Sequence, residues 1–316
     1  MNKTFLMKAS TLQKIKTTKK WAVAYAFILP SFALLLLFHI IPILMSVFYS
    51  FHDYNAVQAP IFTGLKNYQR MITDPFVSAS LFNTVFYSLL VVPAQTVISM
   101  VLAYVLARKC NNRWGQFTRS ALFIPVITSM IMATAIWRIL LSGDGGVVNT
   151  ILQFFGFSSV NWLGQRWPSL IAVCIIAVWK NVGYFLVIFY AGMMDVPTSL
   201  YEAATVDGAN SAQQFLKITL PILKPITYLV ITLGTIWSFQ VFDLVYTLTG
   251  GGPGRSTVTL VLTIYNAAFK EYKMGYASAI STFLLVIVLA VSMLQKFVLG
   301  DKSNFKLRRK SKNENT

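Results

Sequence analysis

The stretch YEAATVDGANSAQQFLKITLPILKP, residues 201–225, is polar and helix-prone, and it lies between two strongly apolar segments. Glu202 is predicted to lie in the first turn of a short helix, where the helix dipole favours negative charge. Gly208 permits a break in the chain. A second helix with one apolar side follows, and Pro221 and Pro225 are predicted to end it. The sequence therefore predicts a helix-turn-helix that projects from the apolar segments.

The beginning of this hairpin has the composition of a contact surface. The small residues Ala203 and Ala204 let another protein approach closely, while the charge of Glu202 fixes the register of the contact. Composition alone leaves an alternative open, an amphipathic hairpin that only joins two membrane spans.

The composition of the whole chain excludes an ordinary soluble domain. Of 316 residues, 56% are hydrophobic and 12% are charged, and the mean hydropathy is +0.62. A net charge of +17 would suit a nucleic-acid-binding protein, but the lysines and arginines cluster at the ends of apolar runs rather than on a polar face. We therefore expect a multi-span, all-α membrane protein with no nucleic-acid partner.

The distribution of apolar segments predicts six transmembrane helices, each close to the length needed to cross a bilayer. Nineteen lysines and arginines lie on the side of the two termini and the hairpin, and six lie on the opposite side. The positive-inside rule therefore places both termini and the hairpin in the cytoplasm. The predicted spans are residues 21–50, 79–107, 120–137, 168–194, 226–248 and 275–295.

The chain divides into four parts on this basis. They are a basic cytoplasmic tail (1–20), a first span with its external loop (21–78), a membrane domain of five helices (79–297) that contains the loop 195–225, and a second basic tail (298–316). Short external helices are predicted at 147–155 and 256–272. Polar residues of the second span, among them Gln95, need partners in protein or water because lipid offers none.

The residue inventory does not suit an enzyme or a metal site. The chain has two histidines, both near the first span, and no HExxH, CxxC or GxSxG motif. It also lacks GxxxxGK[ST], so we expect it to bind no cofactor and to hydrolyse no ATP itself. A membrane enzyme and an ion-coupled secondary transporter are the alternatives. The latter would need coupling-ion carboxylates or paired broken helices, and Asp243 is the one carboxylate placed clearly within a predicted span.

The hairpin resembles the EAA loop of permeases in ABC importers. That motif reads EAA, three residues, Gly, nine residues and Ile-x-Leu-Pro. The same spacing occurs here as Glu202-Ala203-Ala204, Gly208, Ile218 and Leu220-Pro221.

This resemblance implies the transmembrane domain of a type I ABC importer, with the hairpin as the coupling helix that sits in a cleft of an ATPase subunit. The implied assembly is a heterodimer with a second six-span permease, an ATPase dimer that uses ATP and Mg²⁺, and an extracellular solute-binding protein, in a bacterial cell membrane. The residues implied at the ATPase contact are Glu202, Ala203, Ala204, Asp207, Gly208, Leu220 and Pro221.

Two external segments resemble the sugar branch of these permeases, in its maltose-F-like subunit type. They are the first loop, with FTGLKNY at 62–68 and DPF at 74–76, and LTGGGP at 248–253, which is similar to an LTxGGP turn. The resemblance implies import of an oligosaccharide or related sugar. Import of a sugar phosphate such as glycerol 3-phosphate is the alternative.

Candidate substrate residues lie in the fourth and fifth spans. A sugar site favours an aromatic ring under the apolar sugar face, with amides and hydroxyls for the sugar hydroxyls. Interhelical packing is the alternative for each candidate, Asp243 could instead hold a neighbouring helix, and Lys180 could face the cavity or pair with an acid of another subunit. In maltose-type permeases the matching spans hold the sugar. The candidates are Asn181, Gly183, Tyr184, Trp237, Ser238, Gln240 and Asp243.

Overall fold

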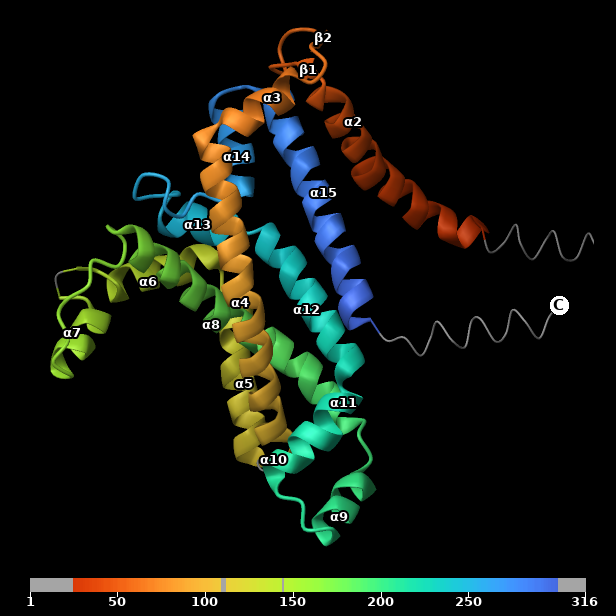
Figure 1. Ribbon diagram of the computed structural model, residues 1–316, viewed down its shortest axis with the longest axis vertical. Coiled ribbons are helices and arrows are strands. Elements are labelled where there is room, and N and C mark those ends of the chain that lie inside the picture. The colour runs from red at the N-terminus through yellow and green to blue at the C-terminus, as the bar shows by residue number, and fades with distance from the viewer. Residues whose placement is uncertain (1–24, 109–111, 144, 301–316) are drawn as a thin grey trace, which may run out of the picture.

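The computed structural model describes residues 25–108, 112–143 and 145–300, and these residues form an elongated helical bundle (Figure 1). Four helices are long and apolar enough to cross a membrane, and the count becomes six if two bent helix pairs are each one span. The prediction of an all-α polytopic membrane fold is therefore confirmed. The four long helices are Tyr25–Ser50, which includes η1 (Leu36–Ile40) and α2 (Ile41–Ser50), α4 (Pro75–Arg108), α8 (Arg166–Met194) and α15 (Met274–Leu299).

The shorter elements connect these helices, and the short helix predicted near 147–155 is confirmed as α7. The external segment predicted as one helix at 256–272 begins later, at Leu260. The shorter elements are β1 (His52–Asp53), β2 (Ile61–Phe62), α3 (Lys66–Thr73), α5 (Arg113–Ile127), α6 (Met130–Leu140), α7 (Val147–Phe154), α9 (Thr198–Val206), α10 (Ser211–Gln214), η2 (Phe215–Thr219), α11 (Leu220–Ile222), α12 (Lys224–Phe239), α13 (Asp243–Leu248), α14 (Leu260–Tyr265) and η3 (Asn266–Lys270).

The third predicted span, 120–137, is interrupted. The chain there forms α5 and α6, which meet at an angle of 99°. Thr128 has extended backbone angles, and its hydroxyl donates to the Pro125 carbonyl at 2.7 Å. The ammonium of Lys180 on α8 donates to the carbonyls of Pro125 and Thr128, both at 2.8 Å. This lysine therefore satisfies carbonyls that the break leaves without helical partners, a role different from the two that the sequence suggested.

The fifth predicted span, 226–248, is also interrupted. Helix α12 ends at Phe239, and α13 begins at Asp243 after a short non-helical segment. The Val241 carbonyl in that segment accepts a hydrogen bond from the Thr259 hydroxyl at 3.0 Å. A distant part of the chain thus supplies the partner that a continuous helix would have supplied. Asp243 consequently lies at the start of a separate helix rather than inside a span.

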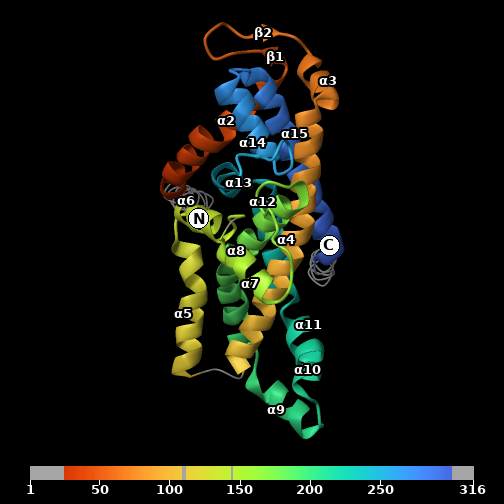
Figure 2. The same cartoon turned by 90° about the vertical axis from the view of Figure 1, so that its left-hand side faces the viewer.

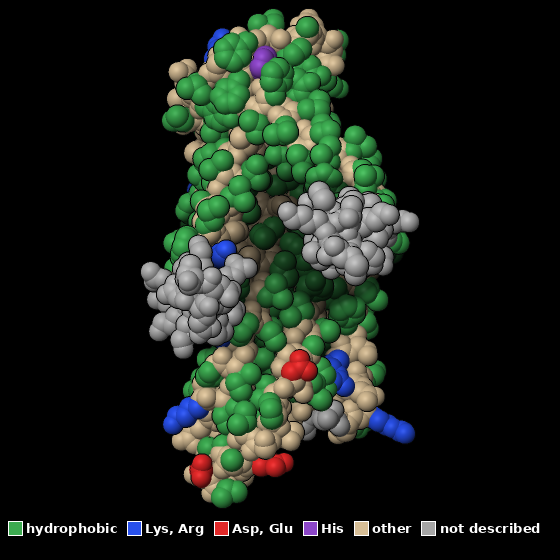
Figure 3. All heavy atoms as spheres, turned by 90° about the vertical axis from the view of Figure 1, so that its right-hand side faces the viewer, with side chains coloured by type: hydrophobic (Ala, Val, Ile, Leu, Met, Phe, Trp, Pro, Cys, Tyr) green, Lys and Arg blue, Asp and Glu red, His purple; other side chains and the backbone are tan. Residues whose placement is uncertain are grey.

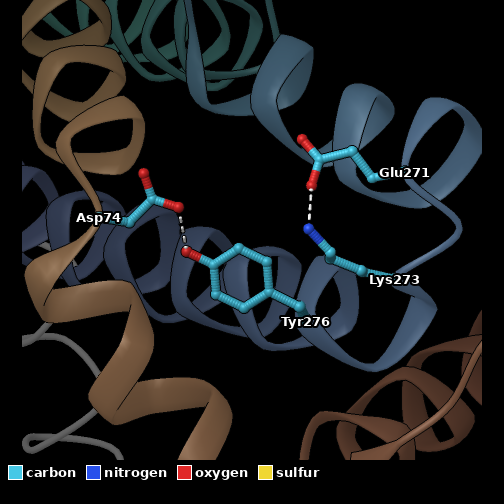
Figure 4. A network of polar contacts seen from close by, with 4 residues as sticks. All are labelled: Asp74, Glu271, Lys273 and Tyr276. Carbon is cyan, nitrogen blue, oxygen red and sulfur yellow. Dashed lines mark hydrogen bonds and ion pairs between the residues drawn. The ribbon is translucent and has the colours of Figure 1, made fainter.

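The two ends of the molecule differ in structure. Figures 1 and 2 show the β1–β2 ribbon and α3 at one end of the long axis and the hairpin of α9 and α10 at the other. Beside the ribbon, the Tyr276 hydroxyl donates to an Asp74 carboxylate oxygen at 2.7 Å, and Lys273 forms an ion pair with Glu271 at 2.6 Å (Figure 4). The Tyr276 hydrogen bond ties the start of α15 to the α3–α4 junction.

The core lies mainly where α4 packs against α8, and it includes the fully buried side chains of Phe185 and Phe189. By contrast, the first helix contacts α15 at the end near the β1–β2 ribbon and leans away from the bundle at the other end (Figure 1). None of the most apolar window of this helix is buried, and the face in Figure 3 is largely hydrophobic. Such an apolar surface requires lipid or another membrane protein around it.

Candidate functional site

The hairpin begins four residues earlier than the sequence indicated. Helix α9 starts at Thr198, directly after Pro197, so Glu202 lies in its second turn. The prediction that the helix dipole stabilises this carboxylate in the first turn is therefore wrong, because that effect falls off within one turn. The break at Gly208 is confirmed, since its φ of +79° is a conformation that favours glycine.

The second arm of the hairpin begins with a capping box. The Asn210 side chain accepts from the Gln213 backbone N–H, and the Gln213 side chain accepts from the Asn210 N–H, both at 2.9 Å. Pro221 lies inside α11, and Pro225 lies in the first turn of α12. The second helix ends between the two prolines, since α11 ends at Ile222 and α12 begins at Lys224, so the prediction of where it ends is confirmed. The chain bends by 73° between them, at Leu223.

Two tyrosines attach the hairpin to the membrane helices. Tyr201 is only 2% exposed, its hydroxyl bonds the Thr219 hydroxyl at 2.9 Å, and the Arg108 guanidinium lies 3.7 Å from its ring centre. Tyr104 of α4 donates to the Ser211 carbonyl at 2.9 Å. Sequence reasoning missed both residues. The available signal was the aromatic residue directly before the EAA triplet.

The motif residues themselves lie on the surface of this framework. Glu202, Ala203, Asp207 and Gly208 are exposed, and Ala204 is half-buried. Leu220 and Pro221 of the second arm are exposed as well. In Figure 3 acidic side chains gather at the end of the molecule where α9 lies. The hairpin therefore offers a small-residue, acidic surface that is free to meet another protein.

A cavity of about 320 Å³ lies between α4, α6, α8, α12 and α13. Its wall brings together five of the residues that the sequence singled out, although they come from separate helices. Tyr87 of α4 also lines it, and sequence reasoning missed that residue. The predicted residues in the wall are Asn181, Trp237, Ser238, Gln240 and Asp243.

The remaining two candidates lie outside the cavity wall. A Cβ atom on Gly183 would be 2.1 Å from the Leu122 carbonyl oxygen, so this glycine permits close packing of α8 against α5. The Tyr184 ring lies 4.9 Å from the Trp237 ring, centre to centre. Tyr184 thus supports an indole that lines the cavity, whereas Gly183 has the packing role.

Buried contacts orient the polar groups of the cavity. The Asn181 side-chain amide donates to the Gln95 side-chain oxygen Oε1 at 3.1 Å, and Gln95 is completely buried. The need of this glutamine for a partner was visible in the sequence, but the identity of the partner was not. Asp243 forms no ion pair within the described part of the chain, and it occupies the first turn of α13, where the helix dipole favours a carboxylate.

Comparison with known proteins is consistent with this architecture. Residues 25–300 match the family of binding-protein-dependent transport system inner membrane components, and the chain belongs to this family. The predictions of an ABC importer permease, and of a transport component rather than an enzyme, are therefore confirmed, as is the multi-pass membrane location.

Named relatives cover most of the chain. The trehalose/maltose transport system permease protein MalF of Thermococcus litoralis is 34% identical, over 86% of this chain and 92% of that protein. The arabinooligosaccharides transport system permease protein AraP of Bacillus subtilis is 35% identical, over 89% of this chain and 90% of that protein. A chain in the crystal structure of a bacterial alginate ABC transporter, in complex with an alginate pentasaccharide-bound periplasmic protein, superposes with a TM-score of 0.79, covering 92% of this chain and 97% of that chain. At 20% identity, that likeness supports the type I importer fold alone.

Proposed function

We propose that this permease subunit carries an oligosaccharide or related sugar into the cytoplasm, after an extracellular solute-binding protein has delivered it. The observation that carries the proposal is the cavity wall, which Trp237 lines together with Asn181, Ser238 and Gln240. An aromatic face suits the apolar side of a sugar ring, and the amides and hydroxyl suit its hydroxyl groups. The names of the relatives MalF and AraP, which refer to sugar transport, support the same substrate class.

The charge of the cavity favours a neutral sugar over a sugar phosphate. No lysine or arginine is among the described residues that line it, whereas the Asp243 carboxylate is. A phosphate group would be repelled by this carboxylate and would find no cation to bind it. Import of glycerol 3-phosphate is therefore the less favoured alternative.

Three partners complete the proposed importer. The exposed acidic hairpin supports docking on an ATPase dimer, which would bind ATP and Mg²⁺. The exposed apolar face of the first helix supports contact with a second permease in a heterodimer. The excess of lysine and arginine on the hairpin side supports cytoplasmic termini and an external face that meets the binding protein.

The geometry suggests how a movement driven by ATP hydrolysis in the partner would be transmitted to the cavity. The hairpin is attached to α4 through Tyr104 and continues across the bend at Leu223 into α12. Helix α12 is continuous from Lys224 to Phe239, and its far end carries Trp237 and Ser238 into the cavity wall. Closure of the ATPase dimer against the hairpin would tilt α12 and so change the access of the cavity to either side of the membrane.

The test is Glu202→Lys, measured as ATP-driven uptake of a labelled neutral oligosaccharide and as co-purification of the ATPase. We expect protein levels in the membrane to be normal, uptake to be lost and the ATPase to dissociate, because the charge that sets the register of docking is reversed. Glu271→Lys is the matched control, since Glu271 is an exposed external glutamate that pairs with Lys273. Normal uptake and co-purification in Glu202→Lys would show that the hairpin is only a connector.

A further inference from the structure

The Gln95 side chain of α4 lies behind the wall of the central cavity and contacts two helices that supply that wall, α8 and α12. Toward α8, its Oε1 atom accepts the hydrogen bond from the Asn181 amide. Toward α12, its Nε2 atom lies where a Cβ atom on Gly234 would be only 2.5 Å away. Gln95 is not among the described residues that line the cavity, so it can affect a bound sugar only through its neighbours.

Stability does not explain a glutamine at this position. The Nε2 atom is buried and has no hydrogen-bond partner within the part of the chain that the structure describes. A buried donor left unpaired is destabilising, and the unbranched side chain of methionine would fill the same space without it. The packing of α4 against α8 also has its own anchor, because the Ser99 hydroxyl, one turn further along α4, donates to the Val182 carbonyl at 3.0 Å. The bond to Asn181 is therefore the reason for Gln95.

This bond fixes which end of the Asn181 amide faces the cavity. The Nδ2 atom of Asn181 donates to Gln95 at 3.1 Å, behind the wall. Among the described residues, none donates a hydrogen bond to its Oδ1 atom, although Asn181 lines the cavity. An amide oxygen accepts hydrogen bonds and never donates them. A sugar hydroxyl that meets Asn181 must therefore donate its proton.

We propose that Gln95 and Gly234 are positioning residues that set the specificity of the cavity, an inference that rests on the proposed function. Gln95 holds the Asn181 amide so that its oxygen, and not its NH₂ group, meets the sugar. Gly234 leaves the space that Gln95 needs. Trp237 and Ser238 of the cavity wall lie one turn further along the same side of α12. The site thus selects a sugar that carries a hydroxyl group at this point.

The experiment measures a preference between sugars with the complete importer in proteoliposomes. A panel of neutral disaccharides and trisaccharides of glucose, galactose and arabinose identifies the sugar that the wild type takes up best. This sugar then competes for ATP-driven uptake with its monodeoxy and deoxyfluoro analogues, in which hydrogen or fluorine replaces one hydroxyl. The preference is a ratio, so it does not depend on how much importer is folded. The same binding protein is used throughout, so its contribution cancels between variants.

The wild type should reject the deoxy and deoxyfluoro analogues of one hydroxyl equally, since fluorine cannot donate a hydrogen bond. In Gln95→Met, the preference for the parent sugar over both analogues should fall about fivefold, because the Asn181 amide is no longer held. The melting temperature of this variant should not fall, since the unpaired donor has been removed. Gly234→Ala should cause the same loss of preference, because its methyl group would displace the end of the Gln95 side chain.

Two further variants test whether the effect passes through Asn181. In an Asn181→Ala background, Gln95→Met should cause no additional loss of preference. Gln295→Met is the matched control, because the Gln295 amide of α15 donates to the Thr235 hydroxyl at 2.7 Å and neither residue lines the cavity. This control should keep the preference of the wild type.

An unchanged preference in Gln95→Met would overturn the proposal. A wild type in which fluorine restores uptake wherever hydrogen abolishes it would also overturn it, since Asn181 would then donate to the sugar. An additional loss in the Asn181→Ala background would show that Gln95 acts by a route other than Asn181. Absence of ATP-driven uptake for the whole panel would instead overturn the proposed function itself.

Discussion

In the hairpin the motif residues follow one another along a single segment, from Glu202 to Pro221, and most of them are exposed. In the central cavity the candidate residues come from α8, α12 and α13, and buried neighbours orient them. The hairpin depends on local backbone geometry, of which the positive φ of Gly208 is the clearest example. The cavity depends on contacts between distant segments, such as that of Asn181 with Gln95.

This difference predicts which substitutions matter and how. A residue of the hairpin should tolerate changes that keep the backbone conformation and the exposed surface. A residue of the cavity should respond to small changes of shape, because protein interiors are close-packed. The two regions are also distinguishable by their readouts, since the hairpin should affect ATPase attachment and the cavity should affect the apparent affinity for sugar.

Of the substitutions that distinguish the hairpin from the cavity, Gly208→Val is expected to have the largest effect on transport. The positive φ costs an L residue about 1–2 kcal/mol, and a β-branched side chain makes that conformation harder still. ATPase co-purification and uptake should fall about 10- to 30-fold. Gly208→Asn is the matched control, because asparagine visits this conformation readily, and it should retain most of the uptake. Equal losses in the two variants would show that the side chain, rather than the backbone, is what matters at this position.

A smaller loss is expected for Trp237→Ala. The indole is 39% exposed and packs against Tyr184 and Phe185. Its removal should raise the KM for neutral oligosaccharide uptake by about tenfold, the equivalent of about 1.4 kcal/mol, and should leave ATPase attachment intact. Trp237→Phe keeps an aromatic face and should show only part of this increase. An unchanged KM in Trp237→Ala would remove this residue from the sugar pathway.

The smallest effect on transport is expected for Gly183→Ala, although this change should affect stability. The added methyl group would meet the Leu122 carbonyl, and overpacking of this kind costs about 1–3 kcal/mol. The melting temperature of the purified protein should fall, while the KM of the folded importer stays at the wild-type value. A changed KM with an unchanged melting temperature would instead place Gly183 on the sugar pathway.

Much of the fold was readable from the sequence because hydropathy and motif spacing are local properties. The second, fourth and sixth predicted spans correspond to α4, α8 and α15, each a few residues longer than predicted. The interruptions of the third and fifth spans were not readable. Hydropathy reports that a segment is apolar, but it contains no information on the direction of the chain within the membrane.

Each interruption is stabilised by a partner far away in the sequence. The break near Thr128 depends on Lys180 of α8, and the break after Phe239 depends on Thr259. The same limitation applies to the candidate site. Trp237 and Ser238 were recognisable as candidates by residue type. That Gly183 packs against α5 and does not line the cavity became clear only from the positions of α5 and α8.

The sequence by itself determined the membrane class, the distribution of charge that orients the spans, and the EAA-like hairpin, since these properties depend on residues close together in the chain. Only the tertiary structure decided which side chains share the central cavity, where the third and fifth spans bend, and that Arg166 and Arg255 line one pocket. The physical reason is that these features arise when helices pack. Packing brings together groups that are separated by many residues, and no local pattern records which groups those will be.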